Sequence, residues 1–580
     1  MEARGRGWVC AISFALVVAC TSEPRRPPLL TDIPTLPSDR IPKRTAAFQS
    51  APCWVTPTDE YAVDCGYVTA AAHAESPGGA SVKLAVAVVY SNGASVAADP
   101  VVFLDGGPGE ASLSDFLGAV PFDSILDDRD LILFDQRGTG FSTPKPDCDI
   151  SNVAVSSPTD AGVAQSDAGV PDEVVAALAA CRDRAAADGI DLSIFRSSEN
   201  AADVTAVREA LGYAQWNLYG ISYGTRYALT ALRDQSKGVR TAVIDSVVPL
   251  QADLLADQGV SFYDDLHRIA AACSLQAPCS ENYGDIESKA LTALDRIEAN
   301  PPDVRVDGGM ATVSAELVAS LLQTAMYSAV SIAYLPQIIQ EIFDGDYSLF
   351  APELSAESST STLLDSATYF STVCAEDAPF SSPAAMNARL GAIPGAWRRW
   401  FAPTSIFDVC DVWQVPAAPA VDHQPVDSSV PTLVMSGAFD PITPPSYGAL
   451  AAQTLARSQS VVLTEEAHGS STSPCGKRIL RDFLNDPSAT VDSTCAVETS
   501  ISFDALQAPR SPSALTFVTT GQRPPPDVVA RLHSPATFPF APLAVPAPHS
   551  VSVAPLVRNN RSGSCKSRPI SISKVPAKRL

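Results

Sequence analysis

The sequence predicts an α/β fold: a mostly parallel sheet with helices on both faces and a helical insertion that forms a cap. Three observations predict it, namely short apolar segments without polar alternation, helical segments between them, and one long segment where the alternation stops. Continuous apolar runs are typical of strands buried on both faces, and strands that alternate with helices form parallel sheets. The 580 residues are 46% hydrophobic and 18% charged, which is enough apolar material for a large core.

Seven segments are expected to be strands, because each is short, apolar and rich in Val, Ile, Leu or Phe. In chain order they cover residues 82–90, 101–104, 131–134, 216–219, 241–248, 432–436 and 460–463. Helices are expected between or after them at 172–188, 201–211, 225–235 and 476–484. This alternation places helices on both faces of the sheet.

The alternation stops in one central segment, at residues 250–430. That segment has the pattern of successive helices, for example at 263–273, 286–299, 315–329 and 383–397. A helical insertion between two strands indicates a cap over the site. We therefore expect a core formed by residues 50–249 and 431–505, with the cap at 250–430 between its two parts.

The first residues have the pattern of an export signal. Arg4 and Arg6 precede an apolar run at 8–19, which is too short for a membrane span and ends in Val17-Val18-Ala19-Cys20. That ending resembles a bacterial lipobox, so we expect a lipoprotein-type signal at 1–20 and lipid attachment at Cys20. An ordinary cleaved signal is the alternative. No other segment is long enough to cross a bilayer, so membrane contact is expected through this anchor only.

Two further segments differ in composition from the body of the chain. Residues 21–49 are rich in Pro, Arg and Thr and are expected to be a tether. Residues 506–580 are Pro-rich and then basic, and we expect them to be disordered. The net charge of −24 argues against nucleic acid as a partner, because phosphates need clustered Lys and Arg.

Ten of the thirteen cysteines form neighbouring pairs along the chain. The pairs are Cys53 with Cys65, Cys148 with Cys181, Cys273 with Cys279, Cys374 with Cys410, and Cys475 with Cys495. Five local disulfides in an oxidising compartment are the simplest assignment, although sequence alone does not fix the connectivity. The sequence has no CxxC or HExxH pattern, so we expect no metal and no other cofactor.

The segment Gly220-Ile221-Ser222-Tyr223-Gly224 has the G-x-S-x-G pattern of a nucleophile elbow. An expected strand leads into it and an expected helix leads out, as the sharp strand-turn-helix requires. The small residues on either side allow the strained turn that raises the Ser222 hydroxyl above the sheet. The pattern therefore predicts Ser222 as a nucleophile, and a plain glycine-flanked turn is the alternative.

A serine nucleophile needs a base and an acid that orients the base. His468 follows the last expected strand and precedes the final helix, which fits the chain order Ser, acid, His; a loop histidine that faces solvent is the alternative. Asp440 lies in the loop directly after the strand at 432–436 and is the expected acid. Asp245, at the end of the preceding strand, is the competing candidate, or a structural hydrogen-bonding group.

An oxyanion hole needs backbone N–H groups directed at the developing negative charge. The loop Asp105-Gly106-Gly107-Pro108-Gly109 follows the strand at 101–104, where such a loop belongs. The expected donors are the N–H of Gly106 or Gly107 and that of Tyr223, the residue after the nucleophile. A simple Gly-Pro turn is the alternative.

Four motifs together resemble the prolyl iminopeptidases and the secreted tripeptidyl aminopeptidases, which have the α/β-hydrolase fold. The motifs are an HGGPG-type loop at 105–109, DQRGTGFS at 135–142, the approach to the nucleophile at 200–211 and 216–229, and SGAFDPITP at 436–444 with the Cys475–Cys495 stretch. The last of these resembles the TAP-like C-terminal module, here 431–505. The likeness runs from about residue 53 to 503 and implies release of single residues or short N-terminal pieces from peptides.

The chain departs from this family pattern at three places. Asp105 stands where many relatives have His, Glu110 where a small residue is common, and Asp245-Ser246 where Asp-Gly is usual. These changes bear on the shape of the oxyanion loop and on the substrate range. None of them removes a residue of the expected triad.

An aminopeptidase must also hold the free ammonium group of its substrate, which requires carboxylates near the cleft. Glu376 and Asp377, beside Cys374 in the cap, are the candidates, followed by Glu110; a solvated acidic loop is the alternative. Arg137 is expected to tie loops together near the site rather than to act in catalysis.

The sequence therefore predicts an exported serine hydrolase, held at the cell envelope by its lipid or secreted, that acts as an exopeptidase on peptides. We expect it to be a monomer. An esterase or other acyl hydrolase on the same scaffold is the first alternative, because a fold does not fix its substrate. A surface lipoprotein that binds peptides or partners without catalysis is the second.

Overall fold

The computed structural model describes residues 36–37, 39–54, 61–115, 122–146, 148, 172–306, 309–350, 365–401, 405–497 and 501–503. All of them belong to one compact unit, 1–543. The expected signal with Cys20, the tether up to residue 35 and the tail at 506–580 lie outside the described residues.

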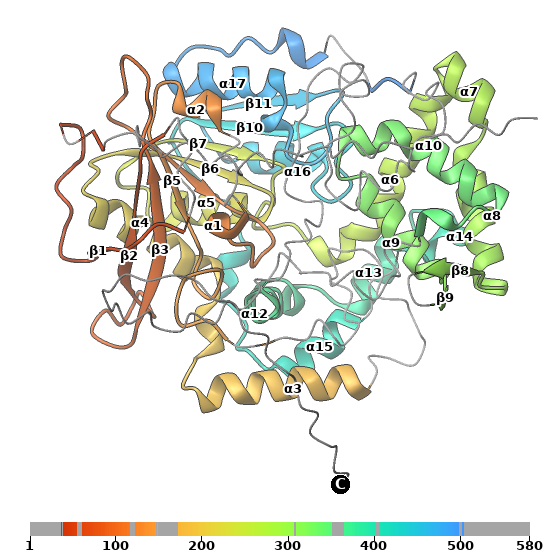
Figure 1. Cartoon of the computed structure of the whole chain (residues 1–580), viewed down its shortest axis with the longest axis horizontal. Coiled ribbons are helices and arrows are strands. Elements are labelled where there is room, and N and C mark those ends of the chain that lie inside the picture. The colour runs from red at the N-terminus through yellow and green to blue at the C-terminus, as the bar shows by residue number, and fades with distance from the viewer. Residues whose placement is uncertain are drawn as a thin grey trace, which may run out of the picture. The chain divides into compact units, whose positions relative to one another are not determined.

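Nine strands in the described residues form one sheet, in the order β1-β2-β3-β5-β4-β6-β7-β10-β11 (Figure 1). Their bounds are β1 Phe48–Ser50, β2 Val63–Ala71, β3 Ser81–Val89, β4 Val101–Leu104, β5 Leu131–Phe134, β6 Trp216–Ile221, β7 Val239–Asp245, β10 Thr432–Gly437 and β11 Ser458–Leu463. Strands β1, β2, β3 and β5 pair antiparallel with their neighbours. All pairs from β5 to β11 are parallel. The prediction of a mostly parallel sheet is confirmed.

The antiparallel end of the sheet contains two strands that were not expected, β1 and β2. In β2, buried and half-buried residues largely alternate, because the strand is not covered equally on its two faces, and its apolar signal is weaker. In the parallel part of the sheet, β7 stops at Asp245, three residues earlier than predicted. Ser246 has a φ of 57°, so the chain leaves the strand there, although Val247 and Val248 beyond it are buried and apolar.

Helices cover both faces of the sheet, as predicted, and each face has its own hydrophobic cluster. One cluster includes residues of α3 Asp172–Ala187, α4 Ser197–Leu211, α5 Tyr223–Asp234 and α16 Pro445–Ala452. The other cluster includes residues of α1 Ser112–Asp115, α2 Asp123–Leu126 and α17 Pro474–Asn485. The carboxyl ends of the parallel strands lie between these layers, where loops can carry polar groups.

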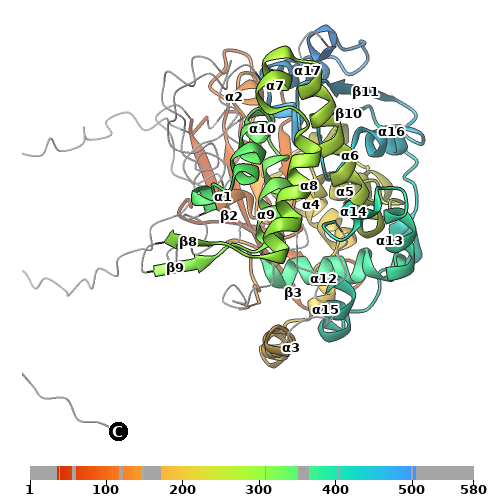
Figure 2. The same cartoon turned by 90° about the vertical axis from the view of Figure 1, so that its right-hand side faces the viewer.

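The described residues between β7 and β10 form helices and one small hairpin, joined by loops. Its first half has the helices α6 Leu254–Ser274, α7 Ala277–Tyr283, α8 Ile286–Ala299, α9 Ala315–Ala325 and α10 Ala329–Asp344, and the hairpin β8 Asp303–Val306 with β9 Gly309–Thr312. These elements lie together beside the sheet and have a hydrophobic cluster of their own (Figure 2). The single helix expected at 315–329 is thus interrupted after Ala325.

The second half of the insertion has the helices α12 Ser366–Glu376, α13 Pro383–Leu390, α14 Gly395–Arg398 and α15 Ser405–Trp413. Of these, α12 and α15 lie below the sheet in Figure 1, whereas α13 and α14 lie to the right of it, near α6, α8 and α9. The helix expected at 383–397 is divided into α13 and α14, and Pro394 precedes the second one. Residues of α12 and α15 pack into the same cluster as α3, α4 and α5.

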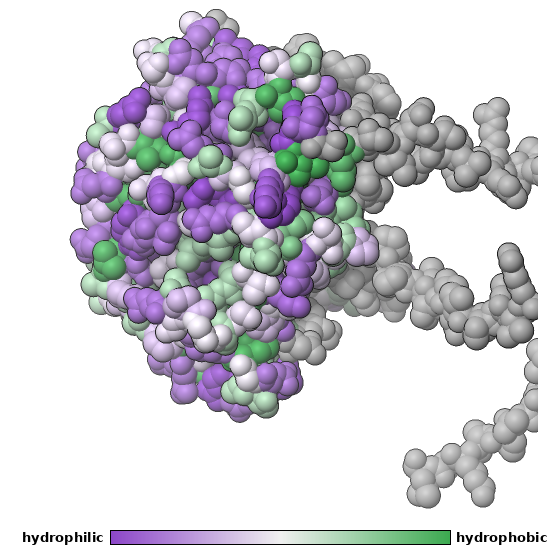
Figure 3. Space-filling view, turned by 90° about the vertical axis from the view of Figure 1, so that its left-hand side faces the viewer, coloured by the Kyte–Doolittle hydropathy of each residue, from purple (hydrophilic) through white to green (hydrophobic). Residues whose placement is uncertain are grey.

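Five disulfides are present, and they join the neighbouring cysteines: Cys53–Cys65, Cys148–Cys181, Cys273–Cys279, Cys374–Cys410 and Cys475–Cys495. This number of disulfides is typical of a protein exported to an oxidising compartment. The described helices include none with the length and hydropathy to span a membrane. Hydrophilic residues cover most of the face shown in Figure 3, and the hydrophobic ones form small separate groups there.

Candidate active site

Ser222 lies in the sharp turn between β6 and α5. It has a φ of 56° and a ψ of −129°, a strained backbone that residues with a side chain rarely adopt. A Cβ on Gly220 would meet the carbonyl of Gly224, and a Cβ on Gly224 would clash with the carbonyl of Leu104. Glycine is therefore required on both sides of the nucleophile elbow, and the turn has the geometry that the motif predicts.

His468 and Asp440 are hydrogen-bonded to each other. Nδ1 of His468 lies 2.9 Å from Oδ2 and 3.1 Å from Oδ1 of Asp440, and both side chains are almost fully buried. Thr443 holds the carboxylate further, because its N–H donates to Oδ1 at 2.8 Å and its hydroxyl to Oδ2 at 2.7 Å. With Nδ1–H directed at Asp440, Nε2 of the imidazole can accept a proton.

Asp245, the competing candidate for the acid, has different partners. Its carboxylate accepts hydrogen bonds from the hydroxyl of Ser470 at 2.7 Å and from the N–H of Ser471 at 2.6 Å. The hydroxyl of Ser471 is bonded to it as well, and to Tyr219. Asp245 thus fixes the loop that follows His468, which is the structural role given as its alternative.

The loops of Ser222, Asp440 and His468 meet at the carboxyl edge of neighbouring strands. The N–H of Ser222 donates to the carbonyl of Asp245, at the end of the adjacent β7. The N–H of Gly469 donates to the hydroxyl of Ser246, one residue further on, at 2.7 Å. Because β10, which leads to Asp440, pairs with β7 on its other side, all three loops surround the same strand end.

The acid and the base shift each other's pKa in opposite directions. Burial raises the pKa of Asp440, but the charge and hydrogen bond of His468 and the bonds from Thr443 outweigh it, and the net pKa is below the usual value. Burial lowers the pKa of His468, but the negative charges of Asp440 and Asp245 outweigh it, and the net pKa is above the usual value. The pair is therefore suited to stabilise an imidazolium.

The hydrogen bonds of the oxyanion loop distinguish Gly106 from Gly107, the two alternative donors that the sequence left open. The N–H of Gly106 donates to Oδ1 of Asp105 and to Oε2 of Glu110, both at 3.0 Å. The N–H of Gly107 donates to none of the described residues, and the N–H of Tyr223, in the first turn of α5, has no partner within the helix. These two N–H groups have the freedom that an oxyanion hole requires.

Glu376 and Asp377, the first candidates for the substrate amine, are both buried and ion-paired with Arg226 of α5. Nε of Arg226 lies 3.1 Å from Glu376, and Nη1 lies 3.0 Å from Asp377. Glu376 also accepts from the hydroxyls of Ser197 at 2.6 Å and Tyr223 at 3.0 Å. Burial raises the pKa of Asp377 to about 6 in spite of Arg226.

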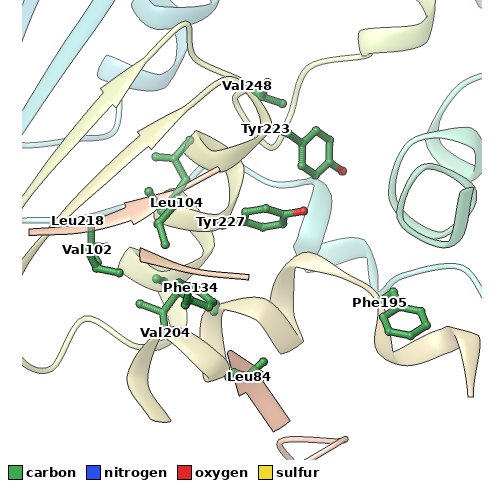
Figure 4. Close-up of a cluster of buried hydrophobic side chains, with 14 of the residues drawn as sticks. Leu84, Val102, Leu104, Phe134, Phe195, Val204, Leu218, Tyr223, Tyr227 and Val248 are labelled. Atoms are coloured by element: carbon green, nitrogen blue, oxygen red, sulfur yellow. The ribbon is translucent and has the colours of Figure 1, made fainter. Parts of the chain in front are cut away.

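This cluster lies directly beside the nucleophile, because Tyr223 follows Ser222. Figure 4 shows the hydroxyls of Tyr223 and Tyr227 directed away from the sheet residues Val102 and Leu104. The third amine candidate, Glu110, is buried in the oxyanion loop next to Asp105. Arg137 is fully buried and bonded to Asp203 at 2.7 and 2.8 Å and to the carbonyl of Ala72, so it ties loops together.

Several residues of the site were not singled out in the sequence. Thr443 contacts both members of the acid–base pair, and Tyr327 stacks edge-on against His468 with ring centroids 5.3 Å apart. Arg226 joins α5 to α12. The three-residue spacing from Asp440 to Thr443 is a local signal that could have been found, since Asp followed by Thr or Ser often closes a turn. The contacts of Tyr327 and Arg226 cross long sequence separations and have no local signal.

The described residues contain no group of three or more His, Cys, Asp or Glu side chains arranged to hold a metal ion.

Comparison with known proteins gives two family matches. Residues 99–278 match the family described as alpha/beta hydrolase fold, and residues 400–495 match the family described as TAP-like protein. The serine protease Hip1 of Mycobacterium tuberculosis is 25% identical over 299 residues, which cover 48% of this chain and 55% of Hip1. The tripeptidyl aminopeptidase of Streptomyces coelicolor is 26% identical over 356 residues, 58% of this chain and 62% of that protein.

The chain thus spans somewhat more than half the length of these curated relatives. Among solved structures, the proline iminopeptidase of Mycobacterium smegmatis is 14% identical with a TM-score of 0.37, over 73% of this chain and 98% of that one. A score this low adds nothing to the topology described above. With the sheet order, the elbow and the match at 99–278, the chain has the α/β-hydrolase fold, and its residues 400–495 are similar to the TAP-like protein family.

Proposed function

We propose that the protein is a serine hydrolase that acts as an exopeptidase and releases N-terminal residues or tripeptides from peptides. The observation that carries the proposal is the buried hydrogen bond between His468 and Asp440, on loops that meet the strained elbow of Ser222. The similarity to a tripeptidyl aminopeptidase and to a serine protease supports peptides as the substrate class.

In the proposed mechanism, the Ser222 hydroxyl attacks the scissile carbonyl while Nε2 of His468 takes its proton. Asp440 keeps Nδ1 protonated and stabilises the imidazolium. The N–H groups of Gly107 and Tyr223 hold the oxyanion of the tetrahedral intermediate. His468 then protonates the leaving amine, and a water molecule, activated by the same imidazole, releases the acyl group from Ser222.

The free ammonium group of the substrate needs a carboxylate, and the chain offers Glu376, Asp377 and Glu110 close to the elbow. Since Arg226 is already ion-paired with both Glu376 and Asp377, a substrate amine would have to compete with a buried guanidinium for them. Glu110 is buried beside the oxyanion loop, where it accepts a hydrogen bond from the N–H of Gly106. We keep all three as candidates for this role.

An esterase is the second candidate function, because the same triad and oxyanion hole would cleave esters. To distinguish a peptidase from an esterase, amino-acyl and tripeptidyl p-nitroanilides are assayed beside short-chain p-nitrophenyl esters, with Ser222→Ala as the control. We expect amide hydrolysis that Ser222→Ala abolishes. Cleavage of esters without any amide would replace the peptidase by an esterase.

The enzyme class has a separate test. A fluorophosphonate probe should label the wild type and not Ser222→Ala, because only an activated serine reacts with it. An unlabelled wild type, although folded, would favour a binding protein without catalysis. We also propose lipid attachment at Cys20; incorporation of labelled fatty acid into the wild type, and its loss in Cys20→Ala, would test that point independently.

A further inference from the structure

Two buried carboxyls lie in the loop after β4, and both are bonded to the same backbone group. Asp105 and Glu110 are only 6% and 5% exposed. The N–H of Gly106 donates to Oδ1 of Asp105 and to Oε2 of Glu110, at 3.0 Å each. Two carboxylates that share one donor in a buried place repel each other, and a proton held between them removes that repulsion.

The surroundings favour a shared proton. Burial is the main cause that raises the pKa of Asp105, and the side-chain hydrogen bond from Glu110 opposes it. Other ionisable groups face the pair: Asp135 at the end of β5, whose pKa burial raises to about 7, and Tyr227 on α5. Beyond these two are Lys145, facing Asp135, and Glu376 and Arg226, facing Tyr227.

Gly106, which is bonded to the carboxyl pair, lies close to the nucleophile Ser222. A methyl group placed on Gly106 would lie 3.1 Å from Oε2 of Glu110 and 3.1 Å from Cβ of Ser222. The next residue is Gly107, whose N–H is the proposed oxyanion donor. The bonds that hold Gly106 in place therefore also set the position of the Gly107 N–H relative to Ser222.

The rest of the loop is held by bonds that do not depend on a titrating side chain. The side-chain amide of Gln136 donates to the carbonyl of Asp105 at 2.9 Å, and the N–H of Asp365 donates to the carbonyl of Gly109 at 2.9 Å. These contacts fix the two ends of the loop. Its middle, which carries Gly106, is held by the carboxyl pair and by one long backbone bond, from the N–H of Glu110 to the carbonyl of Gly106 at 3.5 Å.

We propose that Asp105 and Glu110 are positioning residues of the oxyanion loop, and that a single proton shared between them holds the N–H of Gly107 in place for catalysis. The inference rests on the serine hydrolase proposed above. When the shared proton is lost at higher pH, two negative charges face each other across the N–H of Gly106, and the loop is released. Activity should then fall on the alkaline side, with a midpoint that belongs to the pair.

The decisive variant is Glu110→Gln. Its amide can donate to Asp105 and accept from Gly106, so the bonds persist without a proton to lose. With each pH profile normalised to its own optimum, we expect the alkaline limb of Glu110→Gln to lie about one pH unit or more above that of the wild type. Glu110→Ala removes the bond and should lower kcat about ten- to a hundredfold with a smaller change in KM, a loss like that of an oxyanion donor.

The controls separate this role from folding and from the enzyme class. Glu209→Gln, an exposed glutamate on α4 that pairs with Arg208, should leave the pH profile unchanged. If Glu110→Ala does not fold, Asp105→Asn with Glu110→Gln still tests the proposal, because it leaves no titrating group in the pair.

The outcomes are distinguishable. An alkaline limb that is the same in wild type and Glu110→Gln, or absent from both, would overturn the inference while fluorophosphonate labelling of Ser222 keeps the proposed function. A folded wild type that is not labelled would overturn both.

Discussion

The helical insertion is attached to the core in two different ways along its length. Its first half, from α6 to α10, has its own hydrophobic cluster, and that cluster includes Phe439 and Ala467 of the core. These two residues directly precede Asp440 and His468. The first half therefore packs apolar side chains against the loops of the proposed acid and base.

In the second half, α12 and α15 share a hydrophobic cluster with the core, whereas Leu390 of α13 and Trp397 of α14 belong to the cluster of the first half. Phe370, Val373 and Trp413 belong to the same cluster as the sheet and α5. Besides this apolar packing, a buried ion pair between Glu376 and Arg226 links α12 to the nucleophile helix. The first half thus packs apolar side chains against the loops of the proposed acid and base, and the second half adds buried charges to its packing on the nucleophile helix, so changes in the two halves should fail in different ways.

The largest effect is expected for Asp440, in a loop that packs against the first half of the insertion. Asp440→Asn should reduce kcat/KM about 10⁴-fold, because an amide cannot keep Nδ1 of His468 protonated and correctly oriented. Asp245→Asn, the same change on the neighbouring strand, should cost the folded enzyme at most about tenfold, since it leaves the bond between His468 and Asp440 intact. Steady-state kinetics, normalised by fluorophosphonate titration, gives both values. Equal losses would remove the distinction between the two carboxyls.

The second prediction concerns the stability of the second half. Arg226→Met leaves Glu376 and Asp377 buried without their cation and should lower the free energy of unfolding by about 3–5 kcal/mol. Arg399→Met, in the segment after α14, removes a guanidinium that pairs with Asp295 and Glu298 at the surface and should cost about 0–1 kcal/mol. Urea denaturation followed by circular dichroism compares the two. If both variants lose the same stability, the ion pair at α12 is no stronger than a surface pair.

The two modes of attachment also explain which parts could be predicted from the sequence. β4 and β5 were predicted to the residue, because strands buried on both faces are apolar throughout. The elbow could be predicted because its steric requirement is local: both glycines are needed within five residues. The acid and the base were found by their position after strands, and the bond between them agrees with that interpretation.

The contacts of the insertion could not be predicted in the same way. Arg226 and Glu376 are 150 residues apart, and each residue type is common on protein surfaces. The division of the insertion into two halves depends on which apolar faces meet, and helical periodicity shows only that each helix has such a face. The carboxyl pair at Asp105 and Glu110 was visible only as two unusual residues in a loop.

The third prediction concerns the pH dependence of catalysis, which is set by the pKa of His468 beside the first half. The base must be neutral to accept a proton, and its pKa is raised by Asp440 and Asp245. The protonated form therefore persists to higher pH, and kcat/KM should rise with pH through a midpoint above about 6.5, the usual value for histidine. A kcat/KM profile at constant ionic strength measures it. A midpoint at or below the usual value would mean that the field of the two carboxylates does not govern the base.

The smallest expected effect concerns the polar link between the first half and the acid loop. Nη1 of Arg268, on α6, donates to the carbonyl of Ala438 at 2.6 Å and to Asp265 at 3.0 Å. Arg268→Met should lower kcat about two- to tenfold with little change in KM, because Asp440, two residues after Ala438, loses part of its alignment.

Arg296→Met is the matched control for this link. Arg296 also donates to backbone carbonyls, those of Ile342 and Phe343, but within the first half and away from the triad loops. It should leave kcat unchanged and lose less stability in thermal unfolding than Arg268→Met, because Arg268 also pairs with the buried Asp265. If Arg268→Met and Arg296→Met reduce kcat equally, the effect belongs to the stability of the insertion as a whole. A loss confined to Arg268→Met would mean that α6 aligns the acid, so that the first half acts on catalysis through a single loop.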